Sequence, residues 1–163
     1  MKLHSKHTVL AGYIGYATQA ITINFSPLLF ITFQHEFDIS IGKISLLIAI
    51  SFLTQLSVDA LAAKFSPKLN ARRTVVFGQL CAACGMISFG LLPDLLPSSY
   101  IGLIIATMLA AVGGGIIEVF ISPIIEACPT KEKSSAMSLL HSFYSWGFAA
   151  TVLFRLCFSQ LSE

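Results

Sequence analysis

The sequence predicts an all-α integral membrane protein of about five transmembrane helices, on the evidence of its composition, its apolar runs and its charge placement. Of 163 residues, 55% are hydrophobic and only 11% are charged, and the mean hydropathy is +0.81. Soluble domains carry roughly a quarter charged residues, so this composition excludes the ordinary globular class. No stretch between apolar runs could form a soluble domain, and we expect residues 1–163 to form a single transmembrane helical domain.

Apolar runs of membrane-spanning length recur along the chain. A helix needs about 20 mostly apolar residues to cross the hydrocarbon core. The first run is too long for the apolar part of a signal peptide, so we expect a retained helix there. The expected helices cover about residues 9–33, 44–65, 74–92, 100–125 and 136–157, and the chain is expected to be truncated before a sixth helix.

The basic residues predict the direction in which these helices cross. One side of the expected topology holds Lys2, Lys6, Lys64, Lys68, Arg72, Arg73, Lys131 and Lys133, and the loops on the other side hold Lys43. Basic residues in short loops resist translocation. We therefore expect a multi-pass protein of the plasma (inner) membrane with a cytoplasmic N-terminus.

Three titratable side chains interrupt the apolar runs at a similar depth. Asp59, Glu118 and His141 each lie about 8–10 Å inside the cytoplasmic end of their run, at a rise of about 1.5 Å per residue. Ionisable groups in a membrane are costly and usually face a cavity or a partner. We predict that these three residues form a substrate or proton-coupling layer, because carboxyl and imidazole groups exchange protons.

Two of the three residues also have a structural interpretation that the sequence leaves open. Asp59 is close enough to the interface to pair with Lys64 or Arg72 as a topology anchor. His141 could hydrogen-bond a carbonyl of a neighbouring helix. A structural role is hardest to find for Glu118, and a functional role is favoured there.

Glycine and proline flank Glu118 within the fourth run. Gly113, Gly114 and Gly115 precede it by one turn and allow either a close approach of another backbone or flexing of the helix. Pro123 follows it by five residues, frees a backbone carbonyl and can bend the helix. Glycine-rich and proline-broken helices are typical of transporter binding regions.

The first run carries its own polar residues. Gln19, Thr22 and Ser26 share one helix face, and Asn24 lies off that face. This pattern suits a water-filled cavity and a helix contact equally well, and we include Gln19 and Asn24 among the candidate substrate or proton-coupling residues.

The stretch EVFISP, followed by AMSLLHSFYSWG, resembles the fourth and fifth helices of the fucose–proton symporter group of the major facilitator superfamily. That group has Glu-x-x-x-Asn-Pro before a helix with an aromatic–x–x–x–Gly pattern. Glu118 and Pro123 match its Glu and Pro, Ser122 replaces its Asn, and Tyr144 falls where the group has a substrate-contacting Asn. The resemblance implies that Glu118 takes part in sugar binding and proton coupling.

The loop KFSPKLNARRTVV is similar to the superfamily's cytoplasmic signature Gly-x-x-x-Asp-x-x-Gly-x-Arg-Lys. Arg72 and Arg73 match its basic end, whereas Ala63, Pro67 and Asn70 replace Gly, Asp and Gly. The resemblance covers nearly the whole chain and implies an incomplete N-terminal half of a twelve-helix fold. Because such transporters need two halves around a central site, we expect a missing C-terminal half or a homodimer as partner.

Three classes of function remain. The first is transport of a small solute, a sugar or similar, by a secondary and proton-coupled transporter, here present as a fragment. The second is a small membrane protein that dimerises or binds a partner without transporting. The third is an intramembrane enzyme using Glu118 and His141, which is disfavoured because no nucleophile accompanies them and the pair is too small for a metal site.

The expected partners are a small-molecule solute, protons and the lipid bilayer. No cofactor is expected. Nucleic acid is not expected either, because the basic residues flank membrane segments instead of forming a binding stripe.

Overall fold

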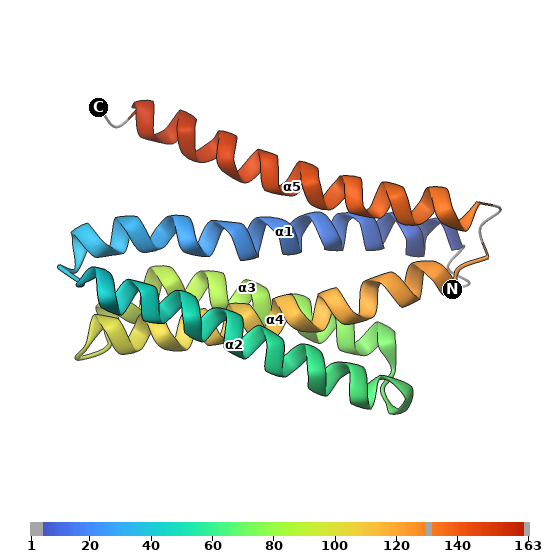
Figure 1. Ribbon diagram of the computed structural model, residues 1–163, viewed down its shortest axis with the longest axis horizontal. Helices are drawn as coiled ribbons and strands as arrows, with labels where there is room; N and C mark the ends of the chain where they lie inside the picture. Colours follow the sequence, from blue (N-terminus) through green and yellow to red (C-terminus); the bar gives the residue numbers. More distant parts are fainter. Residues whose placement is uncertain (1–4, 130–131, 162–163) are drawn as a thin grey trace.

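The computed structural model describes residues 5–129 and 132–161, and every regular element in that part of the chain is helical. The long helices are α1 (Ser5–Glu36), α2 (Ile41–Phe65), α3 (Ala71–Leu95), α4 (Ser99–Ala127) and α5 (Lys133–Leu161), and the short 3₁₀ helix η1 (Ser66–Lys68) joins α2 to α3. Figure 1 shows the five long helices running lengthwise beside one another. The helices reach past most ends of the predicted apolar runs, because backbone hydrogen bonding continues beyond the apolar stretch.

Within the described residues, four helices are long and apolar enough to cross a membrane, namely α1, α2, α3 and α4. The all-α membrane fold predicted from the sequence is therefore confirmed. The fifth helix, α5, has 29 residues and so has the length of a spanning helix. It is not among the four, because its serines, His141 and Arg155 make it more polar than the others.

The centre of the bundle is α4. It packs against each of the other four long helices, and most of its residues from Leu103 to Ile125 are buried or half-buried. Figure 1 shows α1 and α5 on one side of α4, whereas α2 and α3 overlap α4 in this view. A helix in this position presents a different face to every neighbour, so each face needs its own side chains.

Small residues bring α3 and α4 into close contact. A Cβ atom on Gly85 of α3 would lie 2.5 Å from the backbone nitrogen of Ala110, and one on Gly113 of α4 would overlap the backbone of Ala82. In a membrane, where lipid tails are as apolar as leucine, such close backbone packing is a main source of helix association.

The turn after α1 directs α2 back along the bundle. Asp38 has a φ of 49°, and the backbone N–H of Ile39 donates to the carbonyl of Gln34 at 3.1 Å. A residue in the left-handed backbone conformation together with this hydrogen bond forms the Schellman motif at the end of a helix. Asp adopts the left-handed conformation more readily than most residues. The start of α3 is capped by Asn70, whose side chain accepts the N–H of Arg73.

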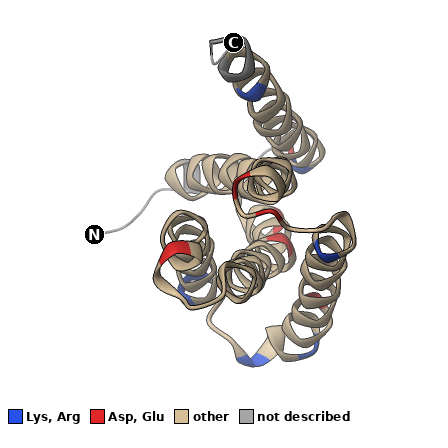
Figure 2. Cartoon of the chain, turned by 90° about the vertical axis from the view of Figure 1, so that its left-hand side faces the viewer, with Lys and Arg blue, Asp and Glu red and all other residues tan. Residues whose placement is uncertain are grey.

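The outer helix α5 packs mainly on α1. A Cβ atom on Gly147 would lie 2.6 Å from the carbonyl oxygen of Ala17, so the two backbones nearly touch there. The Tyr13 hydroxyl donates to the carbonyl of Ala136 at 3.2 Å. In the end view of Figure 2, the helix that leads to the C-terminus projects from the rest of the bundle.

Candidate functional site

Two glutamine side chains hold Glu118 from two different helices. The amide nitrogen Nε2 of Gln19, on α1, donates to Oε2 of Glu118 at 3.2 Å, and Nε2 of Gln55, on α2, donates to the same oxygen at 2.8 Å. We call Gln19 and Gln55 the amide clamp. Hydrogen bonds from two helices fix the direction of the carboxylate, while Glu118 itself stays exposed. We call the surface on which Glu118 is exposed the open face of the bundle.

The two arms of the amide clamp differ in burial. Gln19 is only 1% exposed, and its Nε2 also donates to the backbone carbonyl of Gly114 at 3.2 Å. Both groups that face Nε2 are acceptors, so hydrogen bonding favours the amide with its nitrogen, and not its oxygen, at this position. Its Oε1 is buried without a hydrogen-bond partner among the described residues. Gln55 is half-buried at the edge of the cluster.

The three glycines before Glu118 each meet a different helix. Gly113 faces the backbone of α3, and a Cβ atom on Gly114 would lie 3.0 Å from Cδ1 of Ile23 on α1. A Cβ atom on Gly115 would lie 2.7 Å from Oδ1 of Asp59 on α2. All three positions therefore serve a close approach; flexing of α4 at these glycines stays a prediction.

Asp59 lies beside α4, in the space that Gly115 leaves open. Its Oδ1 is buried and has no hydrogen-bond partner in the described structure, and its carboxylate interacts electrostatically with Glu118. The structure shows no ion pair joining Asp59 to Lys64 or Arg72, all of which it describes. The two intramembrane acids thus share one region, as the sequence suggested from their depth.

His141 is connected to this region through a tyrosine. Its ring lies edge-on to that of Tyr16, with ring centroids 5.9 Å apart, and the rings of Tyr144 and Tyr16 lie 5.1 Å apart. Tyr16 precedes Gln19 by three residues, so the aromatic group made of Tyr16, Tyr144 and His141 lies about one helical turn along α1 from the side chain that binds the carboxylate.

The remaining candidates lie outside this cluster. Asn24 donates to the carbonyl of Ala20 in its own helix at 2.7 Å, and α4 continues as a helix through the exposed Pro123. Arg72 and Arg73 are exposed in the first turn of α3. Of the polar residues of the first run, only Gln19 reaches Glu118.

Gln55 and Tyr16 belong to the site but were not selected from the sequence. Gln55 precedes Asp59 by four residues, and Tyr16 precedes Gln19 by three. Each of them therefore shares a helix face with a residue that was selected. A search for polar or aromatic neighbours at these spacings would have found both.

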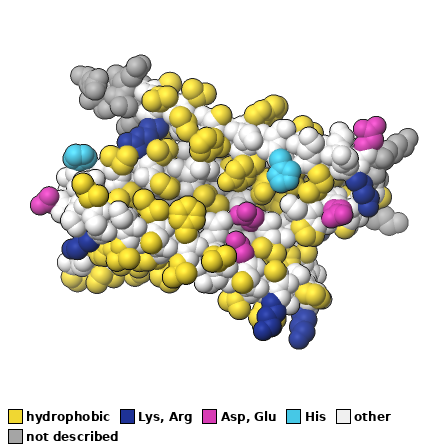
Figure 3. Space-filling view, viewed as in Figure 1, with side chains coloured by type: hydrophobic (Ala, Val, Ile, Leu, Met, Phe, Trp, Pro, Cys, Tyr) yellow, Lys and Arg dark blue, Asp and Glu magenta, His cyan; other side chains and the backbone are white. Residues whose placement is uncertain are grey.

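Acidic side chains are few on the broad face of the molecule. Figure 3 shows acidic side chains near the middle of a face that is otherwise mostly hydrophobic. An exposed carboxylate with two amide donors on one oxygen and no hydrogen bond recorded to the other can accept hydrogen bonds from the hydroxyl groups of a solute. Within the described residues, no three or more His, Cys, Asp or Glu side chains are grouped so as to hold a metal ion.

The comparison with known families agrees with this architecture. The profile of the Major Facilitator Superfamily matches residues 10–160, which takes in nearly the whole chain and all five long helices. No match was found among curated proteins or among solved structures. The superfamily consists of multi-pass membrane transporters, and four helices here have the length and composition to span a membrane. The chain belongs to the Major Facilitator Superfamily.

Proposed function

We propose that this protein takes part in secondary transport of a small polyhydroxylated solute, a sugar or a similar molecule, coupled to protons. The observation that carries the proposal is the amide clamp on Glu118, which directs one carboxylate oxygen inward and leaves the residue open to the exposed face. A structural carboxylate would be expected to have both oxygens enclosed or paired.

The aromatic group beside the carboxylate supports a sugar as the solute. Tyr144 and His141, which pack against the buried ring of Tyr16, provide ring surfaces that are not fully buried, and Glu118 provides a hydrogen-bond acceptor for hydroxyl groups. Binding sites for small molecules combine apolar and aromatic walls with a few placed polar groups. The resemblance of EVFISP to the fucose–proton symporter group points in the same direction.

Glu118 is also the proposed coupling residue. A proton taken up at the free oxygen would turn an acceptor for the solute into a donor, so proton and solute binding would depend on each other. Asp59, close by on α2, is a second proposed carrier of the proton. Alternating access needs a second set of helices to cover the open face, supplied by further chain or by a second copy. We place the protein in the plasma membrane with its N-terminus in the cytoplasm.

The test is uptake of labelled sugars into vesicles that contain the protein, driven by a proton gradient. Glu118→Gln keeps the size of the side chain, and we expect it to lower gradient-driven uptake by at least about tenfold, because a hydrogen bond to a charged group is lost. The matched control is Glu126→Gln, eight residues later on α4 and exposed at its end.

Exchange of labelled for unlabelled sugar across the vesicle membrane separates the two proposed roles of Glu118. Retained exchange with lost driven uptake assigns Glu118 to proton coupling. Loss of both activities assigns it to solute binding as well. Equal uptake by the Glu118→Gln and Glu126→Gln variants would reject the proposal.

A further inference from the structure

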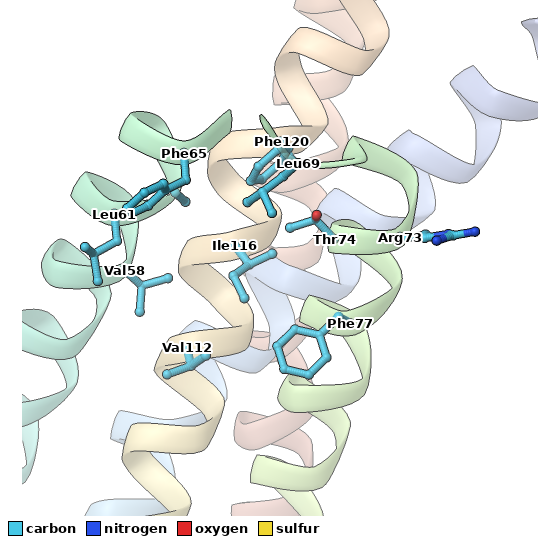
Figure 4. A pocket seen from close by; sticks show the side chains of 11 residues that line it. Val58, Leu61, Phe65, Leu69, Arg73, Thr74, Phe77, Val112, Ile116 and Phe120 are labelled. Atoms are coloured by element: carbon cyan, nitrogen blue, oxygen red, sulfur yellow. The ribbon is translucent and has the colours of Figure 1, made fainter. Parts of the chain in front are cut away.

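A groove of about 500 Å³ lies between α2, α3 and α4, away from Glu118. Its walls are mostly apolar and consist of Val58, Leu61, Ala62, Phe65, Leu69, Arg73, Thr74, Phe77, Val112, Ile116 and Phe120. Figure 4 shows these side chains converging from three helices. On α4, Ile116 and Phe120 are each two positions from Glu118, which is about 200° around a helix, so the groove uses the opposite face.

One end of this groove is strongly basic. Lys64, Lys68, Arg72 and Arg73 all lie in or beside the connection between α2 and α3, and all four are exposed. No Asp or Glu occurs in residues 60–93, and the structure shows no ion pair for any of the four. Four positive charges, none with an ion-pair partner among the described residues, therefore lie at the membrane edge of an apolar groove.

Arg73 belongs both to the lining of the groove and to its basic end, and Thr74 follows it in the lining. In Figure 4 the Thr74 side chain lies among the groove residues, while the guanidinium of Arg73 points away from the apolar wall. An elongated occupant with an apolar tail and an anionic head would fit both environments at once. Arginine suits such a head, because its planar guanidinium binds phosphate through two parallel hydrogen bonds.

We propose that this groove binds an anionic phospholipid, with an acyl chain along the apolar walls and the phosphate at the basic end. Contact of an acyl chain with the apolar walls does not by itself select one lipid over another, since all lipid tails are as apolar as protein side chains. Selectivity comes from the basic end, because clusters of Lys and Arg at a membrane surface attract anionic lipids.

A second copy of the chain is a poorer occupant. Two copies meeting through the same face, related by an axis along the membrane normal, would bring their basic ends together at the same depth. The four unpaired charges of each copy would then repel those of the other, whereas an anionic headgroup neutralises them.

The test measures quenching of a tryptophan in the groove by brominated lipids. The reporter is Phe77→Trp, at a groove residue that is 57% exposed, in a Trp146→Phe background that removes the single native tryptophan. We expect brominated phosphatidylglycerol to quench it with a relative association constant at least about fivefold above that of brominated phosphatidylcholine, the effect of one basic residue near an anionic lipid. Equal quenching by the two lipids would overturn the proposal.

A control reporter separates a groove site from general attraction to the surface. Val76→Trp places the reporter on the neighbouring exposed residue of α3, which does not line the groove, and should show no preference between the lipids. The same preference at both positions would mean that surface charge alone collects the lipid, which contradicts the proposal.

Charge removal completes the test. Arg72→Gln together with Arg73→Gln should abolish the preference seen by the Phe77→Trp reporter, whereas Lys133→Gln, at the exposed start of α5, should leave it unchanged. Helical circular dichroism and elution as a single species establish that each variant is folded. A preference that survives the double substitution in a folded protein would refute the role of the basic end.

Discussion

The helices α4 and α5 both have 29 residues, yet they occupy very different positions. α4 is buried along most of its length and contacts four helices, whereas the buried described residues of α5 are Leu140, Gly147 and Thr151. These three lie at spacings of seven and four, so they form one stripe that faces α1. Length therefore does not set how many neighbours a helix has, whereas the close approaches at glycines differ: α4 has them toward three helices at Gly113, Gly114 and Gly115, and α5 has one toward α1 at Gly147.

Disruption of the close contact between α4 and α3 should have the largest effect on stability. Gly113→Leu adds a side chain where the backbone of Ala82 lies, so we expect more than about 3 kcal/mol of lost stability or no folded protein. Thermal unfolding in detergent measures the change. Gly90→Leu on α3 is the control, because nothing lies within 4 Å of a Cβ atom at that position.

The contact of α5 with α1 should be less costly to break. Gly147→Leu would place a side chain against the carbonyl of Ala17, and we expect a loss of about 1–3 kcal/mol while the other four helices remain packed. Limited proteolysis of the connection between α4 and α5, residues 128–132, reports on the release of α5. The exposed Ala149→Leu is the matched control. If Gly147→Leu unfolds the whole protein, the stability of the bundle depends on α5 as much as on α4.

The smallest effect is expected at the amide clamp, where the comparison can be made within one cluster. Gln19→Ala removes two hydrogen bonds of a buried amide and should cost about 1 kcal/mol. Gln55→Ala removes one bond at the exposed edge and should cost less than about 0.5 kcal/mol. Chemical unfolding in a defined detergent compares the two. An equal cost would show that burial does not distinguish the two arms.

Hydropathy was sufficient to predict the helical membrane fold. Apolar runs of 19 to 26 residues, separated by short polar loops, leave few alternatives to a bundle of spanning helices. The prediction is weaker for α5. This helix has the length of a spanning helix, but its serines and Arg155 make its composition less apolar. Hydropathy reports how much apolar surface a segment has, and it does not report which neighbour covers that surface.

The candidate site was predicted in part. The depth of Asp59 and Glu118 along their helices indicated that they lie at one level, and depth follows directly from the helical rise. The rotation of each helix about its own axis could not be obtained in this way, because it depends on packing. Asn24, which lies off the face of Gln19, bonds within its own helix, and the sequence analysis does not predict the contact of Gln55 with Glu118.

The three consecutive glycines also determine how α4 can change in evolution. Gly113, Gly114 and Gly115 face α3, α1 and α2 in turn, at steps of about 100°. Insertion or deletion of one residue in the first half of α4 would rotate everything after it by one such step, and every glycine would then meet the wrong helix. Substitutions away from these glycines can be accepted one at a time along α4, whereas a change in its length between Ser99 and Glu118 disturbs all three contacts at once.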